Sequence, residues 1–148
     1  METFDLQKTR QIWQRVYNAE APSLDAETLI PLISQEGADA ACCARLAKRL
    51  GGHGSTLLHL VRQYESNAGA LRGIYAFLTG KTPTVAFPPP REEPPYTALK
   101  KCYVNSLSRS RHYEGLADHP DYGPVFRKLA SAARDQCVPL LELIGKLT

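Results

Sequence analysis

Residues 81–96 read KTPTVAFPPPREEPPY, and this stretch decides how the rest of the chain can fold. Five prolines fall within eight residues, at 88–90 and 94–95. Because proline has no backbone N–H and a fixed φ, the stretch cannot be helical and is expected to run as an extended, polyproline-like segment. Its 16 residues span up to about 50 Å, whereas a helix of about 26 residues is about 39 Å long. The segment can therefore return along the whole length of a helical bundle.

Two helices are predicted before this segment, over residues 25–50 and 55–80. Their apolar residues recur at alternating steps of four and three, which is typical of a helix with one buried face. Between them, GGHGS at 51–55 supplies a helix stop and an N-cap at Ser55, so the two helices are expected to form a tight antiparallel hairpin. The predicted inward columns are Leu29, Ile33, Glu36, Ala40, Cys43, Ala47 and Leu50 in the first helix, and Leu57, Val61, Tyr64, Ala68, Leu71, Tyr75 and Leu78 in the second.

Two further helices are predicted after the segment, over residues 97–117 and 124–147. DHPDYGP at 118–124 separates them, and Pro124 suits the first position of the last helix. A long return through 81–96 would start the third helix at the same end as the second, so that these two run parallel. The predicted inward columns are Leu99, Cys102, Ser106, Ser110, Tyr113 and Leu116 or Ala117 in the third helix, and Phe126, Leu129 or Ala130, Ala133, Cys137, Leu140, Ile144 and Leu147 in the fourth.

The whole chain is predicted to be one all-α domain, residues 1–148. A length of 148 residues with 43% hydrophobic content suits a single core, and no segment alternates in the manner of a strand. Residues 1–22 are expected to contribute a short extra helix, over about 4–17, whose apolar side is Ile12, Trp13, Val16 and Tyr17.

The charge, the apolar content and the cysteines restrict which classes of function are expected for the protein. The net charge of +3 comes from 18 basic and 15 acidic residues scattered along the chain, and the short cluster SRSRHY at 108–113 is too small to hold nucleic acid. No apolar run approaches the roughly 20 residues that cross a bilayer, and the N-terminus lacks the pattern of a signal peptide. Four cysteines without CxxC spacing favour free thiols in a reducing compartment. We therefore expect a soluble, cytoplasmic protein that binds neither nucleic acid nor membrane.

Two helical hairpins joined by a long crossover resemble the ferritin-like four-helix bundle, and in particular its rubrerythrin-like branch. The resemblance is carried by LIPLISQEGADAACCARLAKRL at 29–50, YESNAGALRGIYAFLTG at 64–80 and YEGLADHPDYGPVFRKLA at 113–130. It implies a site for two iron ions, held by one Glu on the first and third helices and by Glu-x-x-His on the second and fourth. Carboxylates bridge and neutralise the ions, and the i, i+3 spacing places both ligands on one face of a helix.

Carried onto this chain, the ligand pattern is mostly lost. The first Glu matches Glu36 and the second matches Glu65. The remaining positions fall at Ala68, Ser106, Arg134 and Cys137. Because two carboxylates cannot hold a two-ion cluster, we predict that the guanidinium of Arg134 substitutes for the metal and pairs with Glu36, Glu65 or both. Arg72 is the other charge expected to face inward.

The cysteines permit a different site. If the fourth helix runs antiparallel to the third, Cys102 and Cys137 lie about one turn from the carboxylates and are predicted to be neighbours. Two small core thiols are favoured over a zinc or redox site, because nothing nearby is expected to lower a thiol pKa.

Two functions follow from the sequence. The favoured one is a non-enzymatic structural or interaction protein that has lost its di-iron site, binds no cofactor and is compatible with a homodimer. The alternative is a metal-dependent redox protein of rubrerythrin-like type, an iron-dependent oxidoreductase or peroxidase. In that case Glu36 and Glu65, with Cys137, would keep an altered site for iron or another divalent metal.

Overall fold

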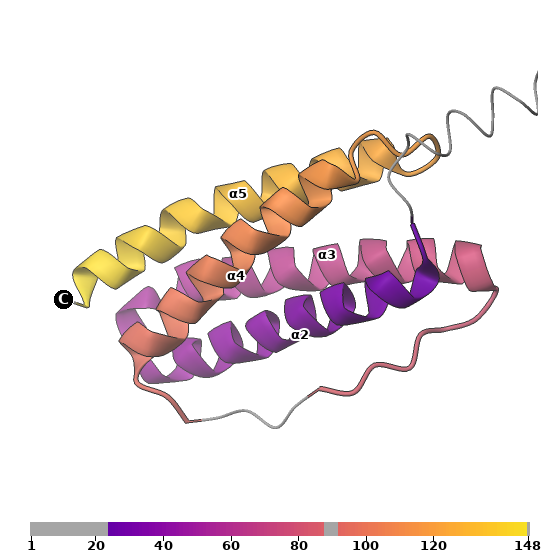
Figure 1. The fold of residues 1–148 in the computed structure, drawn as a ribbon. Coiled ribbons are helices and arrows are strands. Elements are labelled where there is room, and N and C mark those ends of the chain that lie inside the picture. Colours follow the sequence, from indigo (N-terminus) through magenta and orange to yellow (C-terminus); the bar gives the residue numbers. More distant parts are fainter. Residues whose placement is uncertain (1–23, 88–91, 148) are drawn as a thin grey trace, which may run out of the picture.

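Every regular element in residues 24–87 and 92–147, the part of the chain that the computed structural model describes, is helical (Figure 1). The elements are α2 (Ala26–Arg49), the short 3-10 turn η1 (Gly51–His53), α3 (Gly54–Thr79), α4 (Pro95–Gly115) and α5 (Gly123–Lys146). The all-α prediction is confirmed, with four α-helices among these residues. The helix predicted within residues 1–22 lies outside them.

The helix ends follow local sequence signals. Asp25 caps α2 by accepting a hydrogen bond from a backbone N–H of the first turn. Gly80 ends α3 with φ of 71°, a left-handed conformation that favours glycine. Pro124 lies in the first turn of α5, where a backbone N–H has no helical partner in any case. The predicted cap at Ser55 is wrong, because η1 tightens the turn and α3 already begins at Gly54.

The four helices form two antiparallel hairpins that pack against each other. α2 pairs with α3 and α4 pairs with α5, and these two hairpins contain the most extensive helix contacts. Figure 1 shows that the connection from α3 leads back along α2 to the opposite end of the bundle, where α4 begins, so that α3 and α4 run in the same direction. Among the described residues, no helix combines the length and apolar character needed to span a membrane.

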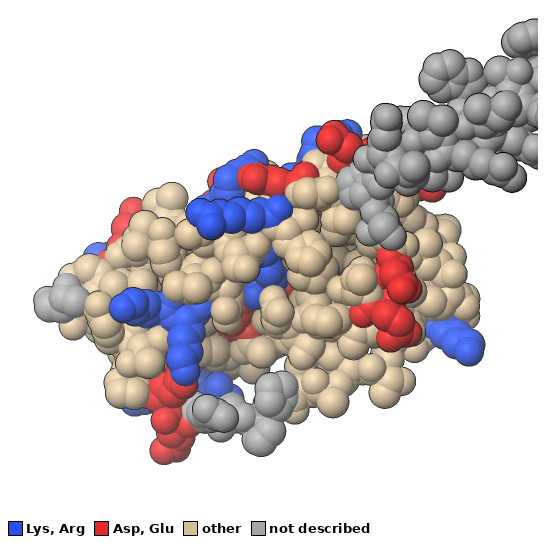
Figure 2. Space-filling model, in the orientation of Figure 1, with Lys and Arg blue, Asp and Glu red and all other residues tan. Residues whose placement is uncertain are grey.

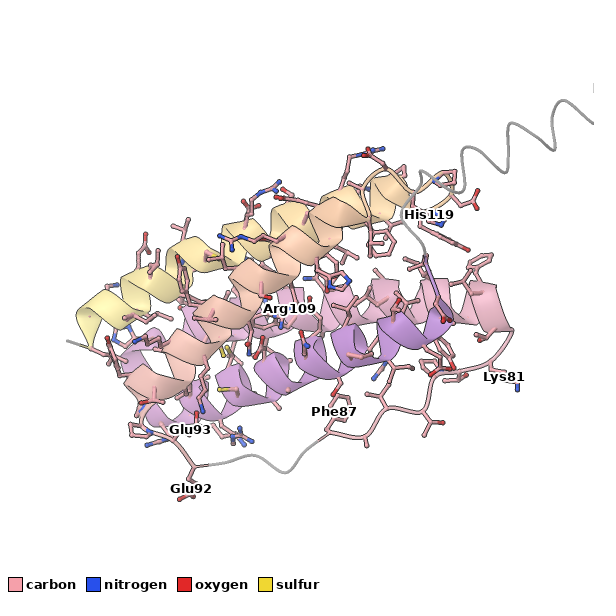
Figure 3. All side chains as sticks on the ribbon, viewed as in Figure 1. Lys81, Phe87, Glu92, Glu93, Arg109 and His119 are labelled. Carbon is pink, nitrogen blue, oxygen red and sulfur yellow. The ribbon has the colours of Figure 1, made fainter. Side chains whose placement is uncertain are left out.

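The connection between α3 and α4 is anchored on the outer side of α2. The Ser34 hydroxyl donates a hydrogen bond of 3.4 Å to the carbonyl of Ala86. Phe87 reaches from the connection toward α2 (Figure 3), and its ring lies over Gly37. A Cβ atom on Gly37 would come within 2.3 Å of Cε1 of that ring, so the missing side chain is what lets the ring approach the helix.

Substitution of Gly37 by alanine is expected to change the stability of the protein differently in two backgrounds. In a Phe87→Ala variant it should stabilise the protein by about 0.5–1 kcal/mol, because alanine favours the helix interior over glycine. In the wild-type background this gain should be offset, because the Phe87 ring must leave α2. A double-mutant cycle by urea denaturation measures the difference. Equal effects in the two backgrounds would show that the ring does not rest on Gly37.

The hydrophobic core is divided into two clusters along the bundle. One lies toward the α4–α5 turn and contains Leu29, Leu32, Ile33, Leu71, Ile74, Tyr113, Leu116, Phe126, Leu129, Ala130 and Ala133. The other lies toward the α2–α3 turn and contains Ala40, Cys43, Leu46, Leu57, Leu60, Tyr64, Ala98, Leu99, Cys102, Leu140 and Leu143. The residues between these clusters are polar.

Candidate functional site

A layer of buried polar side chains separates the two hydrophobic clusters. Within the described residues it consists of Glu36 and Asp39 on α2, Asn67 on α3, Ser106, Arg109 and Ser110 on α4, and Gln136 on α5. All four helices contribute to this polar layer. Because a buried polar group without a partner is costly, the layer must be held together by internal hydrogen bonds and charge pairing.

Arg109 lies at the centre of the polar layer. Its side chain is 1% exposed and reaches from α4 toward α2 (Figure 3). Its Nη2 donates a hydrogen bond of 2.6 Å to Oδ2 of Asp39, and its Nε lies 3.1 Å from Oε1 of Glu36. Glu36 is 0% and Asp39 is 5% exposed, so two buried carboxylates share one buried guanidinium.

Glu36 also accepts hydrogen bonds from two neutral groups. The Tyr113 hydroxyl donates to Oε1 at 2.7 Å, and the side-chain amide of Asn67 donates to the same oxygen at 3.4 Å. The other oxygen, Oε2, is buried and has no protein partner. One carboxylate oxygen therefore connects α2 with α3 and α4, while the second is free to hold a proton or to bind a water molecule.

Asp39 has partners on α4 besides Arg109. The side-chain amide of Asn105 donates to Oδ1 at 3.3 Å, and the Cys102 thiol donates to the same oxygen at 3.7 Å. Both oxygens of Asp39 are thus satisfied, and the residue fixes the position of α2 against α4.

A second hydrogen-bonded chain crosses the layer toward α5. The Tyr64 hydroxyl lies 3.0 Å from Oγ of Ser106, which donates to Oε1 of Gln136 at 3.3 Å. The Arg109 guanidinium lies over the Tyr64 ring, 5.6 Å from its centroid, within the range of a cation–π interaction. Nη1 of Arg109 and Nε2 of Gln136 are buried donors without a protein partner, and Nε of Arg109 pairs with Glu36 by charge without a hydrogen bond. A bridging water satisfies such groups in other proteins.

Burial has the largest effect on the pKa of both carboxyls. It raises the pKa of Glu36 above its ordinary value of 4.5 and that of Asp39 above 3.8, and the Arg109 guanidinium offsets this only in part. Two acids share one guanidinium, so a proton on one carboxyl removes the net negative charge of the layer. Burial lowers the pKa of Arg109, but the two carboxylates raise it by more, and Arg109 stays charged.

The raised pKa of Glu36 predicts a particular dependence of stability on pH. The folded protein keeps the Glu36 proton to higher pH than the unfolded chain, so this stabilisation is fully present below pH 4.5 and is lost as pH rises through the folded-state pKa. The difference in unfolding free energy between wild type and Glu36→Gln is therefore expected to fall as pH rises. Urea denaturation of both proteins over a pH series measures it. A difference that grows with pH would mean that Arg109 dominates over burial.

The predicted role of Arg134 is wrong. Its side chain is 52% exposed and forms an ion pair with Glu114, which is 49% exposed, on the outside of the α4–α5 hairpin. The guanidinium that reaches Glu36 belongs instead to Arg109, from the third predicted helix rather than the fourth. An arginine does lie between two buried carboxylates, but it is Arg109, and the carboxylates are Glu36 and Asp39.

The inward placement of the two charged residues on α3 is also wrong. Glu65 and Arg72 are both exposed, so neither reaches the polar layer. The α3 residue that contacts Glu36 is Asn67, two positions after Glu65. Of the two carboxylates matched to iron ligands, only Glu36 lies inside.

Among the described residues, no hydrogen bond or charge interaction joins Cys102 to Cys137. Cys102 donates to Asp39 and interacts with the thiols of Cys42 and Cys43 on α2. Cys137 is half-buried and donates to the carbonyl of Ala133 in its own helix, while the neighbouring inward position is taken by Gln136. Hydrogen bonding to Cys102 and burial raise the pKa of the Cys42 thiol, and burial raises that of Cys137. Raised pKa values disfavour thiolate chemistry at these residues.

The heptad spacing of the sequence is enough to predict the inward residues that the first set of columns missed. Asn67, Arg109 and Gln136 all fall on columns that alternate steps of three and four. These columns are 57, 60, 64, 67, 71, 74 on α3, then 99, 102, 106, 109, 113, 116 on α4, and 129, 133, 136, 140, 143 on α5. The predicted columns used the adjacent positions 68, 110 and 137.

The polar layer does not fit the two-iron cluster that the resemblance implies. No group of three or more His, Cys, Asp and Glu side chains within residues 24–87 and 92–147 is arranged to hold a metal ion. The space between the two carboxylates is taken by a guanidinium, which repels a cation. Comparisons of the chain with protein-family models, curated proteins and solved structures found no match.

Proposed function

We propose that the protein is a ferritin-like, non-enzymatic bundle in which an arginine takes the place of a metal centre, and that its role is structural or one of interaction. Two packed hairpins, a long connection from α3 to α4, and the shared direction of these two helices support the ferritin-like part of the proposal.

The observation that carries the proposal is the position of Arg109. Its guanidinium contacts both buried carboxylates, and Tyr113 and Asn67 fill further positions around Glu36. A metal ion could enter only by displacing a charged side chain that is 1% exposed and forms its ion pairs with these two carboxylates. Leaving that charge buried without a partner is costly, so the protein itself competes with the metal.

Metal analysis of protein purified without an affinity tag tests this proposal. We expect iron, manganese and zinc far below one equivalent, and no rise in the unfolding temperature when each ion is added. Near-stoichiometric metal that is lost in a Glu36→Ala variant would overturn the proposal and favour a metal-dependent redox protein. Glu65→Ala, a substitution at an exposed position, is the matched control.

An interaction role requires an outer surface that can bind a partner. Val104 on α4 and Val138 and Leu141 on α5 are 54%, 59% and 50% exposed, which is consistent with contacts on this hairpin. We propose a homodimer through these helices, and light scattering over a concentration series measures it. A monomer at every concentration would reject the dimer without affecting the proposal on Arg109.

A further inference from the structure

A cavity of about 1340 Å³ lies on one side of the bundle, between α2, α4, Phe87 and residues 92–95. Small side chains line its floor: Gly37, Ala38, Ala41, Cys42, Ala98 and Cys102. Phe87 and Leu46 add larger apolar surface. The floor is thus suited to an apolar ligand body of limited width.

The charged residues of the cavity lie toward the start of α4. Figure 2 shows this face of the molecule, with basic and acidic side chains at that end of the bundle and others along its upper edge and at its opposite end. Lys101 forms an ion pair with Glu93, and Asp39 is paired with Arg109, so these charges are neutralised within the protein. Glu92 is exposed and turned away from the bundle (Figure 3).

Two guanidiniums in the cavity have no carboxylate partner in the part of the chain that the structure describes. Arg45 and Arg49 lie one turn apart on α2, on the same side of the helix, and both line the cavity. Arg49 donates to the backbone carbonyl of Glu93 at 3.1 Å, and Arg45 makes no ion pair within the described residues. A ligand with an anionic group would complete this pair of charges.

We propose that this cavity binds an organic carboxylate with an apolar body, its carboxylate at Arg45 and Arg49 and its apolar end toward Phe87 and Gly37. Arg45 lies eight positions after Gly37 on α2, a rise that corresponds to a ligand about 12 Å long. The proposed carboxylate site lies outside the polar layer, because neither Arg45 nor Arg49 belongs to it, although Asp39 of that layer also lines the cavity.

Titration of the full chain with decanoate, followed by calorimetry, tests the proposal. We expect one saturable site with a Kd of about 10–100 μM. The double variant Arg45→Ala/Arg49→Ala should bind about five- to thirty-fold more weakly, as expected for two exposed charge pairs. Arg62→Ala/Arg72→Ala removes the same charge from exposed positions of α3 and should bind like wild type. Ala41→Trp should block the cavity and abolish binding, and circular dichroism checks that each variant is folded.

The cysteines supply a second readout of where the ligand binds. Cys42 lines the cavity, whereas Cys137 is comparably half-buried on α5 and outside it. Because the pKa of both thiols is raised, their alkylation by N-ethylmaleimide is slow and is followed over hours by peptide mass spectrometry. Decanoate is expected to slow it further at Cys42 and to leave it unchanged at Cys137.

Three results would overturn the proposal. The first is the absence of saturable binding, which includes the case in which another part of the chain or a second copy fills the cavity. The second is equal affinity of the two double-arginine variants. The third is equal affinity for decanoate and the uncharged decanol, because the proposed site requires the carboxylate.

Discussion

Substitution of Arg109 by methionine is expected to lower the free energy of unfolding by about 3–5 kcal/mol at neutral pH. Methionine fills a similar volume but leaves Glu36 and Asp39 in the interior without a cation. One or both carboxyls must then stay protonated or remain buried as unpaired charges. Since a domain of this size is stable by only about 5–15 kcal/mol in total, the loss is large enough to be read directly from urea denaturation.

Arg134→Met is the matched control for this substitution. It removes the same side chain from an exposed ion pair with Glu114 and should change stability by less than about 1 kcal/mol. The triple variant Arg109→Met/Glu36→Gln/Asp39→Asn also replaces the two buried carboxylates by neutral amides. It should recover most of the lost free energy of unfolding, even if Arg109→Met alone does not fold. Equal effects of the two single arginine substitutions would contradict a buried ion cluster.

Substitution of Tyr113 by phenylalanine is expected to cost about 1.5–3 kcal/mol, because its hydroxyl donates a short bond to a carboxylate. The ring remains, so its stacking on Phe126 is retained. The cost should rise with pH, since the bond strengthens when Glu36 loses its proton. Thermal or urea denaturation at several pH values gives the measurement.

Tyr64→Phe provides the comparison for Tyr113→Phe. Both tyrosines are 0% exposed, but the Tyr64 hydroxyl lies against the neutral Ser106. Its loss should cost about 0.5–1.5 kcal/mol and should not vary with the protonation of Glu36. If the two substitutions cost the same at every pH, Glu36 carries no charge in the folded protein.

The helices and much of the core could be predicted because burial imposes a period on the sequence. The apolar residues of α2 and α5 repeat at steps of three and four, and the prolines at 88–90 and 94–95 exclude a helix between α3 and α4. Glu36 was predicted inside for the same reason, since it lies on the apolar column that begins at Leu29. These features depend only on local geometry and on the cost of exposing apolar surface.

The partner of Glu36 could not be predicted with the same certainty. Arg109 and Ser110 are adjacent and lie on two columns of similar spacing, and serine is the more usual residue in a core. Placing Arg109 inside is favourable only because Glu36 and Asp39 meet it across the bundle. This contact joins two helices, so the residue pattern of either helix alone does not predict it. The ligand pattern instead points to Arg134, and the same register places Cys137, not Gln136, in the inward position.

A crystal structure of protein purified without added metal or chelator, with anomalous diffraction data, tests the central claim most directly. We predict that density for the Arg109 guanidinium lies against Asp39 and Glu36, with no anomalous peak between the two carboxylates. A fully occupied ion at that position, with Arg109 turned out toward solvent, would contradict the account.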